Sequence, residues 1–66
     1  MVSKGEWQRD LATLERAAAN ECYERATHAA TKELKRTHVL AADLHTEAAD
    51  LCDRLATVYD RLDALN

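Results

Sequence analysis

The sequence predicts an all-α protein, in which an antiparallel helical hairpin pairs with a second copy as a homodimeric four-helix bundle. Three observations support this. The 66 residues include one Gly and no Pro, so few positions break a helix. Residues 44–65 carry apolar side chains at alternating spacings of three and four, which is heptad periodicity. A polar segment, residues 35–38, separates two apolar stretches of similar length. We expect one helical interaction domain spanning residues 1–66.

The first helix is expected to begin at about Lys4. Ser3 and Glu6 have the spacing of a capping box, in which each side chain bonds to a backbone N–H group at the helix start. An apolar stripe follows on one side of this helix, and it weakens after Cys22. Its members are Trp7, Leu11, Leu14, Ala18, Cys22 and Ala29.

The C-terminal stretch carries the strongest pattern in the chain. Its heptad seam, called here the leucine seam, consists of Leu44, Ala48, Leu51, Leu55, Val58, Leu62 and Leu65. Two further rows flank it at seven-residue spacing: His38, His45, Cys52 and Tyr59 form one, and Ala42, Ala49 and Ala56 form the other. Two-stranded coiled coils usually carry charges at such flanks. This wide apolar face therefore predicts a bundle, with more than one neighbouring helix, rather than a bare zipper.

Three topologies fit these patterns. In the preferred one the chain turns near residues 36–38, with Thr37 as a cap, and forms helices of about 4–36 and 38–65. In the second, Thr46 caps a helix after a turn at His45-Thr46. In the third there is no turn, and a single long helix pairs with another chain in a coiled coil.

Self-association is expected because the chain has few large apolar side chains with which to build a core of its own. The predicted contact residues lie in both apolar stretches, and they favour a dimer. They are Trp7, Leu11, Leu14, Ala18, Cys22, Leu44, Ala48, Leu51, Leu55, Val58, Leu62 and Leu65.

No combination of residues indicates catalysis, a cofactor or a metal. His38, His45 and Cys52 lie seven residues apart, about 10.5 Å along a helix, which is too far for one zinc ion. Glu24 and His28 at i,i+4 are expected to be a solvated pair. A turn near 36–38 would place Cys22 nearly opposite Cys52, where they would be small buried hydrophobes or, alternatively, a disulfide.

The basic cluster Lys32, Lys35 and Arg36, with His38 beside it, is the candidate partner surface. The formal net charge is −3, which argues against general nucleic-acid affinity. The charge is unevenly distributed, however: residues 1–37 carry seven Lys/Arg against six Asp/Glu, whereas residues 38–66 carry two against six. The cluster suits an acidic protein patch or a phosphate backbone.

One segment resembles a known family. Thr46-Glu47-Ala48-Ala49-Asp50-Leu51-Cys52-Asp53-Arg54-Leu55 resembles the start of the second helix in Rop, a family of small plasmid RNA-binding proteins. The resemblance implies a dimer of helical hairpins, and it aligns the turn of that family with His45-Thr46. The N-terminal half of the chain does not follow the family's pattern, so no RNA-binding residue is carried over.

These observations predict a non-enzymatic protein-binding module, such as an adaptor, assembly factor or inhibitor, that self-associates through its heptad faces. The alternative is a dimeric RNA- or DNA-binding bundle that uses the basic cluster. A structural oligomerisation element of a larger protein is a third reading. We expect a cytoplasmic location, because no stretch has the length of a membrane span and two cysteines suit a reducing compartment.

Overall fold

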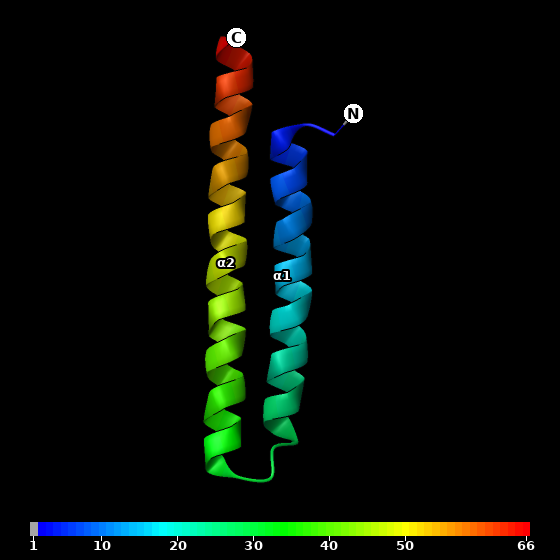
Figure 1. Cartoon of the computed structure of the whole chain (residues 1–66), viewed down its shortest axis with the longest axis vertical. Coiled ribbons are helices and arrows are strands. Elements are labelled where there is room, and N and C mark those ends of the chain that lie inside the picture. The colour runs from blue at the N-terminus through cyan, green and yellow to red at the C-terminus, as the bar shows by residue number, and fades with distance from the viewer. Residues whose placement is uncertain (1) are drawn as a thin grey trace.

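The chain forms an antiparallel hairpin of two long helices, which confirms the predicted all-α hairpin (Figure 1). The computed structural model describes residues 2–66. Helix α1 spans Lys4–Thr27, and helix α2 spans Lys32–Leu65. The Cα atoms occupy an envelope of 53 × 17 × 9 Å. Because α2 is ten residues longer than α1 (34 against 24), its C-terminal end projects beyond the start of α1, as Figure 1 shows.

The start of α1 lies where the capping pattern predicts it. Ser3 is the N-cap residue, and its hydroxyl accepts a hydrogen bond of 3.1 Å from the backbone N–H group of Glu6. The carbonyl of Ser3 also accepts the first helical bond, from the N–H group of Trp7 at 3.0 Å.

The turn lies at residues 28–31, so the predicted turn near residues 36–38 is wrong. Helix α1 ends at His28, whose N–H group donates to the carbonyls of Arg25 and Ala26. Helix α2 starts at Thr31, whose hydroxyl accepts from the N–H group of Leu34 at 3.1 Å. Thr31 is difficult to recognise as a helix cap from the sequence, because the residue three positions after it is Leu34 rather than the Glu or Gln of a capping box.

The two threonines considered as caps lie inside α2. The hydroxyl of Thr37 donates to the carbonyl of Glu33 at 2.9 Å, and that of Thr46 donates to the carbonyl of Ala42 at 2.9 Å. Threonine bonds of this kind, to a carbonyl four residues back, are compatible with a helix interior. The alternative turn at His45-Thr46, which the Rop resemblance also implies, is therefore wrong, and so is the continuous single helix.

Small residues at seven-residue spacing hold the two helices together. On α1 they are Gly5, Ala12, Ala19 and Ala26, and on α2 they are Ala42, Ala49 and Ala56; all are buried. We call this contact the small-residue seam. A Cβ atom placed on Gly5 would lie 3.3 Å from the backbone carbonyl oxygen of Ala56, so the helices approach closely there. Seven-residue steps from that contact set Ala12 against Ala49, and Ala19 against Ala42.

One edge of the hairpin is closed by polar side chains, and we call it the polar edge. Arg9 forms an ion pair with Asp60. Seven residues further along both helices, the guanidinium of Arg16 lies 2.5 Å from Asp53 and 3.3 Å from Asp50. The hydrogen bond from Arg16 to Asp53 is the main reason why the pKa of Arg16 is raised above its ordinary value.

Tyr23 continues the polar edge toward the turn. Its hydroxyl donates a hydrogen bond of 2.7 Å to the Asp43 carboxylate. That bond is the main cause that raises the pKa of Tyr23 above its ordinary value, with burial and the negative charge of Asp43 adding to it. Within the hairpin, Glu15 and His45 also meet, with 2.7 Å between Oε2 and Nδ1. Polar contacts thus fix the same helix alignment as the small-residue seam.

Candidate functional site

The leucine seam of α2 points away from α1. Leu44, Leu51 and Val58 each lie two residues, or about 200° around the helix, after an alanine of the small-residue seam. Leu65 continues the same seven-residue spacing. The side chains of these four residues are 48–83% exposed. Leu55 and Leu62 are 43% and 48% exposed, and Ala48 is half-buried. Helix α1 therefore covers the alanines of α2 and leaves its leucines uncovered.

Helix α1 adds its own large apolar side chains to the same side of the hairpin. Trp7 is 57% exposed and Leu14 is 66% exposed, whereas Leu11 and Ala18 are half-buried. Leu11 and Ala18 directly precede Ala12 and Ala19 of the small-residue seam, and Arg9 and Arg16 lie on its other side. In an antiparallel helix pair, the residues on one side of the contact in the first helix lie beside the equivalent residues of the second helix. The side opposite the polar edge is therefore apolar on both helices.

We call this surface the apolar face. It consists of Trp7, Leu11, Leu14 and Ala18 on α1 and of Leu44, Ala48, Leu51, Leu55, Val58, Leu62 and Leu65 on α2. These are the residues predicted for self-association with one exception: Cys22 is buried between the helices at 8% exposure. No large side chain is fully buried among the described residues, so the hairpin keeps most of its bulky apolar surface in contact with solvent.

The basic cluster lies in the first turns of α2. Lys32, Lys35 and Arg36 are exposed and share one side of the helix through their i,i+3 and i,i+4 spacings. His38 is half-buried and lies away from them, toward α1. A depression of about 310 Å³ adjoins the cluster, and it is lined by Lys35, Arg36, Val39, Leu40 and Asp43. The structure thus groups three of the four predicted partner-surface residues.

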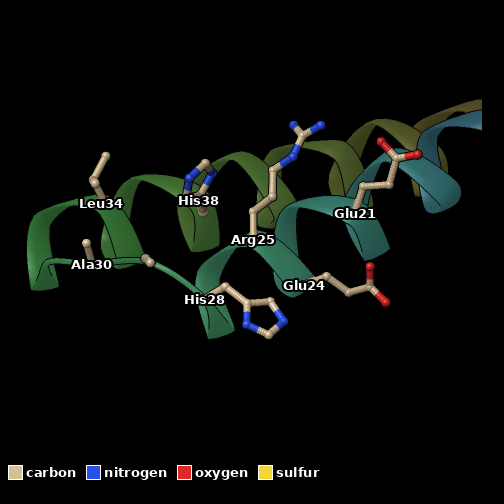
Figure 2. A pocket seen from close by; sticks show the side chains of 8 residues that line it. Glu21, Glu24, Arg25, His28, Ala30, Leu34 and His38 are labelled. Carbon is tan, nitrogen blue, oxygen red and sulfur yellow. The ribbon is translucent and has the colours of Figure 1, made fainter.

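His38 lines a different depression, of about 530 Å³, at the turn end of the hairpin (Figure 2). Arg25, His38 and Leu34 rise from the same side of the hairpin in Figure 2, whereas His28 and Glu24 point to another side. Five of its eight lining residues are charged or histidine, and Leu34, at 48% exposure, is its one large apolar residue. Among residues 2–66, no three His, Cys, Asp or Glu side chains are placed to hold a metal ion.

The two cysteines are both free thiols and do not face each other. The prediction that Cys22 lies nearly opposite Cys52 is wrong, because it depended on a turn near 36–38. Because Gly5 lies against Ala56, Cys22 lies at about the level of residue 39 on α2, 13 residues before Cys52. The two positions are about 20 Å apart along the helix axis, beyond the usual Cα separation of a disulfide.

The polar edge was not predicted from the sequence. Its signal was present, since Arg9, Arg16 and Tyr23 recur every seven residues, as do Asp53 and Asp60 on α2. These residues were individually typical of a solvated helix surface. Only the correct alignment of the two helices shows that the two rows face each other.

Two further findings concern the chain as a whole. Across the described part of the chain, neither helix combines the length and the hydropathy that crossing a bilayer requires. No protein-family model, curated protein or solved structure matches this chain.

Proposed function

We propose that this chain is a non-enzymatic helical protein-binding module, of the adaptor, assembly-factor or inhibitor kind, whose working form is a homodimeric four-helix bundle. The observation that carries the proposal is the apolar face. Eight of its large side chains are each 43–83% exposed, and they lie on one side of both helices. Contiguous apolar patches of this extent mark interaction surfaces in water-exposed proteins.

The size of the apolar face suits a second copy. Eight large side chains that are about half exposed present on the order of 800 Å², which is what one partner contributes to a standard interface. A second hairpin offers the same long, narrow, apolar surface, so two copies cover each other over the whole length of the face. The polar edge, whose groups already pair within the hairpin, stays at the rim.

In this proposal the basic cluster is the surface for the protein partner, because dimerisation leaves it uncovered. Lys32, Lys35 and Arg36 are exposed, and they attract an acidic patch on another protein. The bundle acts in a reducing compartment such as the cytoplasm, where both cysteines stay free.

Sedimentation equilibrium tests the assembly. The variant Leu51→Glu places a charge on the apolar face, and we expect it to halve the mass measured for the wild-type dimer while circular dichroism still reports helix. Thr13→Glu is the control, because it adds the same charge at an exposed position on the polar-edge side of α1, off the apolar face. A wild-type chain that stays monomeric across a 100-fold range of concentration would contradict the proposal. Equal measured masses for the two variants would also contradict it.

Fluorescence anisotropy tests the partner surface with two probes, a polyglutamate peptide and a mixed-sequence RNA duplex. We expect the dimer to bind the peptide, and the triple variant Lys32→Ala, Lys35→Ala, Arg36→Ala to lose that binding. Arg9→Ala, which removes one cation of the polar edge, away from the basic clusters of both copies, should change it little. Binding of the RNA alone, weakening steeply with salt, would replace this function with the alternative of an RNA- or DNA-binding bundle.

A further inference from the structure

We propose that the second copy docks in the opposite orientation, so that the two turns lie at opposite ends of the bundle and each α2 packs antiparallel on the α2 of the other copy. The inference rests on the proposed dimer, and it adds the orientation and the register. It follows from the unequal lengths of the two helices and from the order of side chains along the leucine seam.

The overhang of α2 is the first argument. Lys4, the first residue of α1, lies over the Tyr59 ring, and Arg9 pairs with Asp60, so residues 61–65 at the end of α2 have no neighbouring helix in the hairpin (Figure 1). Leu62 and Leu65 are among these residues, at 48% and 83% exposure. Any arrangement that completes the core must place another helix beside them.

Two symmetric stackings of hairpins are available. If both turns lie at the same end, the overhangs of both copies project together beyond the bundle, and α1 of each copy is too short to reach the overhang opposite. If the turns lie at opposite ends, the overhang of each copy lies beside the N-terminal half of α2 in the other copy. Only the second stacking covers Leu62 and Leu65.

The leucine seam matches itself in this orientation when the two-fold axis passes near Leu51. Leu51 of one copy then meets Leu51 of the other, and the flanking seam residues pair in heptad steps on both sides. Leu44 meets Val58 of the second copy, and Ala48 meets Leu55. Small residues oppose large ones at the second of these contacts, which favours interdigitation.

Helix α1 independently gives the same centre. The contact between Gly5 and Ala56 places Leu51 at about the level of residue 10 on α1. An axis at that level brings Leu11 against Leu11 of the second copy, and Trp7 against Leu14. Both helices thus pair their large apolar residues about a single axis, as one two-fold dimer requires.

Charge selects this register over the neighbouring one. With the axis near Leu51, Glu47 lies beside Arg54 of the second copy at both rims of the interface. Glu47 and Arg54 form no ion pair within the described hairpin. Shifting the axis toward Leu55 would instead place Arg54 beside Arg54, and it would shorten the overlap of the two α2 helices by about one heptad.

The overhang also matches what lies at the turn end of the other copy. There the half-exposed Leu34 lies at the edge of the 530 Å³ depression, and Leu65 of the second copy falls near Thr37 on the next turn. The outer side of the basic cluster stays open to a partner.

Disulfide trapping tests the arrangement in a background with Cys22→Ala and Cys52→Ala. We expect Leu51→Cys to yield a covalent dimer under mild oxidation, because the two Leu51 residues meet at the axis. Leu55→Cys is the matched control and should not link, since each Leu55 faces Ala48. The double variant Thr37→Cys, Leu65→Cys should also link two chains; within one chain these positions are about 42 Å apart on α2 and cannot bond.

The outcomes distinguish whether a dimer forms from how its two copies are oriented. Sedimentation of the unoxidised variants reports whether a dimer forms at all, and a monomer overturns both proposals. A dimer in which Leu55→Cys links instead of Leu51→Cys overturns the register. A dimer in which none of the α2 variants links overturns the opposite orientation and supports turns at the same end. Scattering adds an independent measure: the proposed bundle is about 8 Å longer than the 53 Å hairpin, against about 18 Å for the shifted register.

Discussion

Helix α2 carries two heptad seams that differ in side-chain size and in what covers them. Ala42, Ala49 and Ala56 are fully buried against α1, at 0–1% exposure. Leu51, two residues from Ala49, is 57% exposed. Alanine, the smaller residue, forms the contact within the chain, and leucine, the larger, remains exposed on the face where we propose that a second copy docks.

The difference shows which side of α2 folding uses and which side it leaves exposed. Alanine and glycine let the backbones of α1 and α2 approach closely, and that approach brings the ion-pairing side chains of the polar edge within reach of each other. A leucine on that side would hold the helices apart. Leucines on the outer side bury more apolar area per residue, which is what association of two separate copies needs.

Substituting the small-residue seam should have the largest effect. Ala49→Leu forces a large side chain into the closest contact between the helices, and we expect a cost of about 3 kcal/mol. The melting temperature, followed by circular dichroism, should fall by about 15 °C for a chain of this size. Ala17→Leu on the exposed side of α1 is the control and should melt near the wild type. An Ala49→Leu variant that melts within about 3 °C of the wild type would mean that α1 does not pack on the alanines.

The reverse substitution on the leucine seam should leave the hairpin intact and weaken the dimer. Leu51→Ala removes about 1.5 kcal/mol of burial from each copy, so the dissociation constant should rise about 100-fold. Analytical ultracentrifugation over a concentration series measures this. An unchanged constant would show that the second copy does not cover Leu51.

The polar edge should contribute less than either seam. Arg9→Gln removes the ion pair with Asp60, in which both side chains are about half exposed. Exposed pairs of this kind contribute at most about 1 kcal/mol, and salt screens them. The melting temperature should fall by a few degrees at low salt, and the difference from the wild type should shrink in 1 M NaCl. A difference that grows with salt would exclude an electrostatic role.

The smallest effect is expected from titration of Tyr23. The bond from its hydroxyl to Asp43 raises the pKa of Tyr23, so its contribution to stability is present below the ordinary tyrosine pKa and is lost as pH rises through the folded-state value. Absorbance at 295 nm in a Tyr59→Phe background follows Tyr23 alone. Asp43→Asn should move that transition to lower pH. A transition that is the same in both proteins would indicate that the bond does not persist in solution.

Much of the fold could be predicted from the sequence because its signals are local. Low Gly and Pro content predicts helix, Ser3 and Glu6 locate the start of α1, and the heptad spacing identifies the leucine seam. The residues of the apolar face, Cys22 aside, were also selected from the sequence. Large apolar side chains at heptad spacing share one side of a helix whatever that side contacts.

The turn could not be predicted in the same way. Residues 28–31 contain neither Gly nor Pro, and none has a positive φ, so the turn lacks the usual sequence signal. The polar segment 35–38 was the stronger apparent break, yet it lies within the first turns of α2, where Lys35, Arg36 and Thr37 are exposed to solvent and His38 is half-buried.

The sequence by itself thus determined that the chain is helical, where α1 begins, and which residues form its two heptad seams. Only the tertiary structure decided that the alanine row, rather than the leucine row, faces α1. The physical reason is that the alignment of two helices depends on the sum of many contacts at once. The closest approach comes at Gly5 and the alanines, and the same alignment satisfies Arg9, Arg16 and Tyr23 on the polar edge.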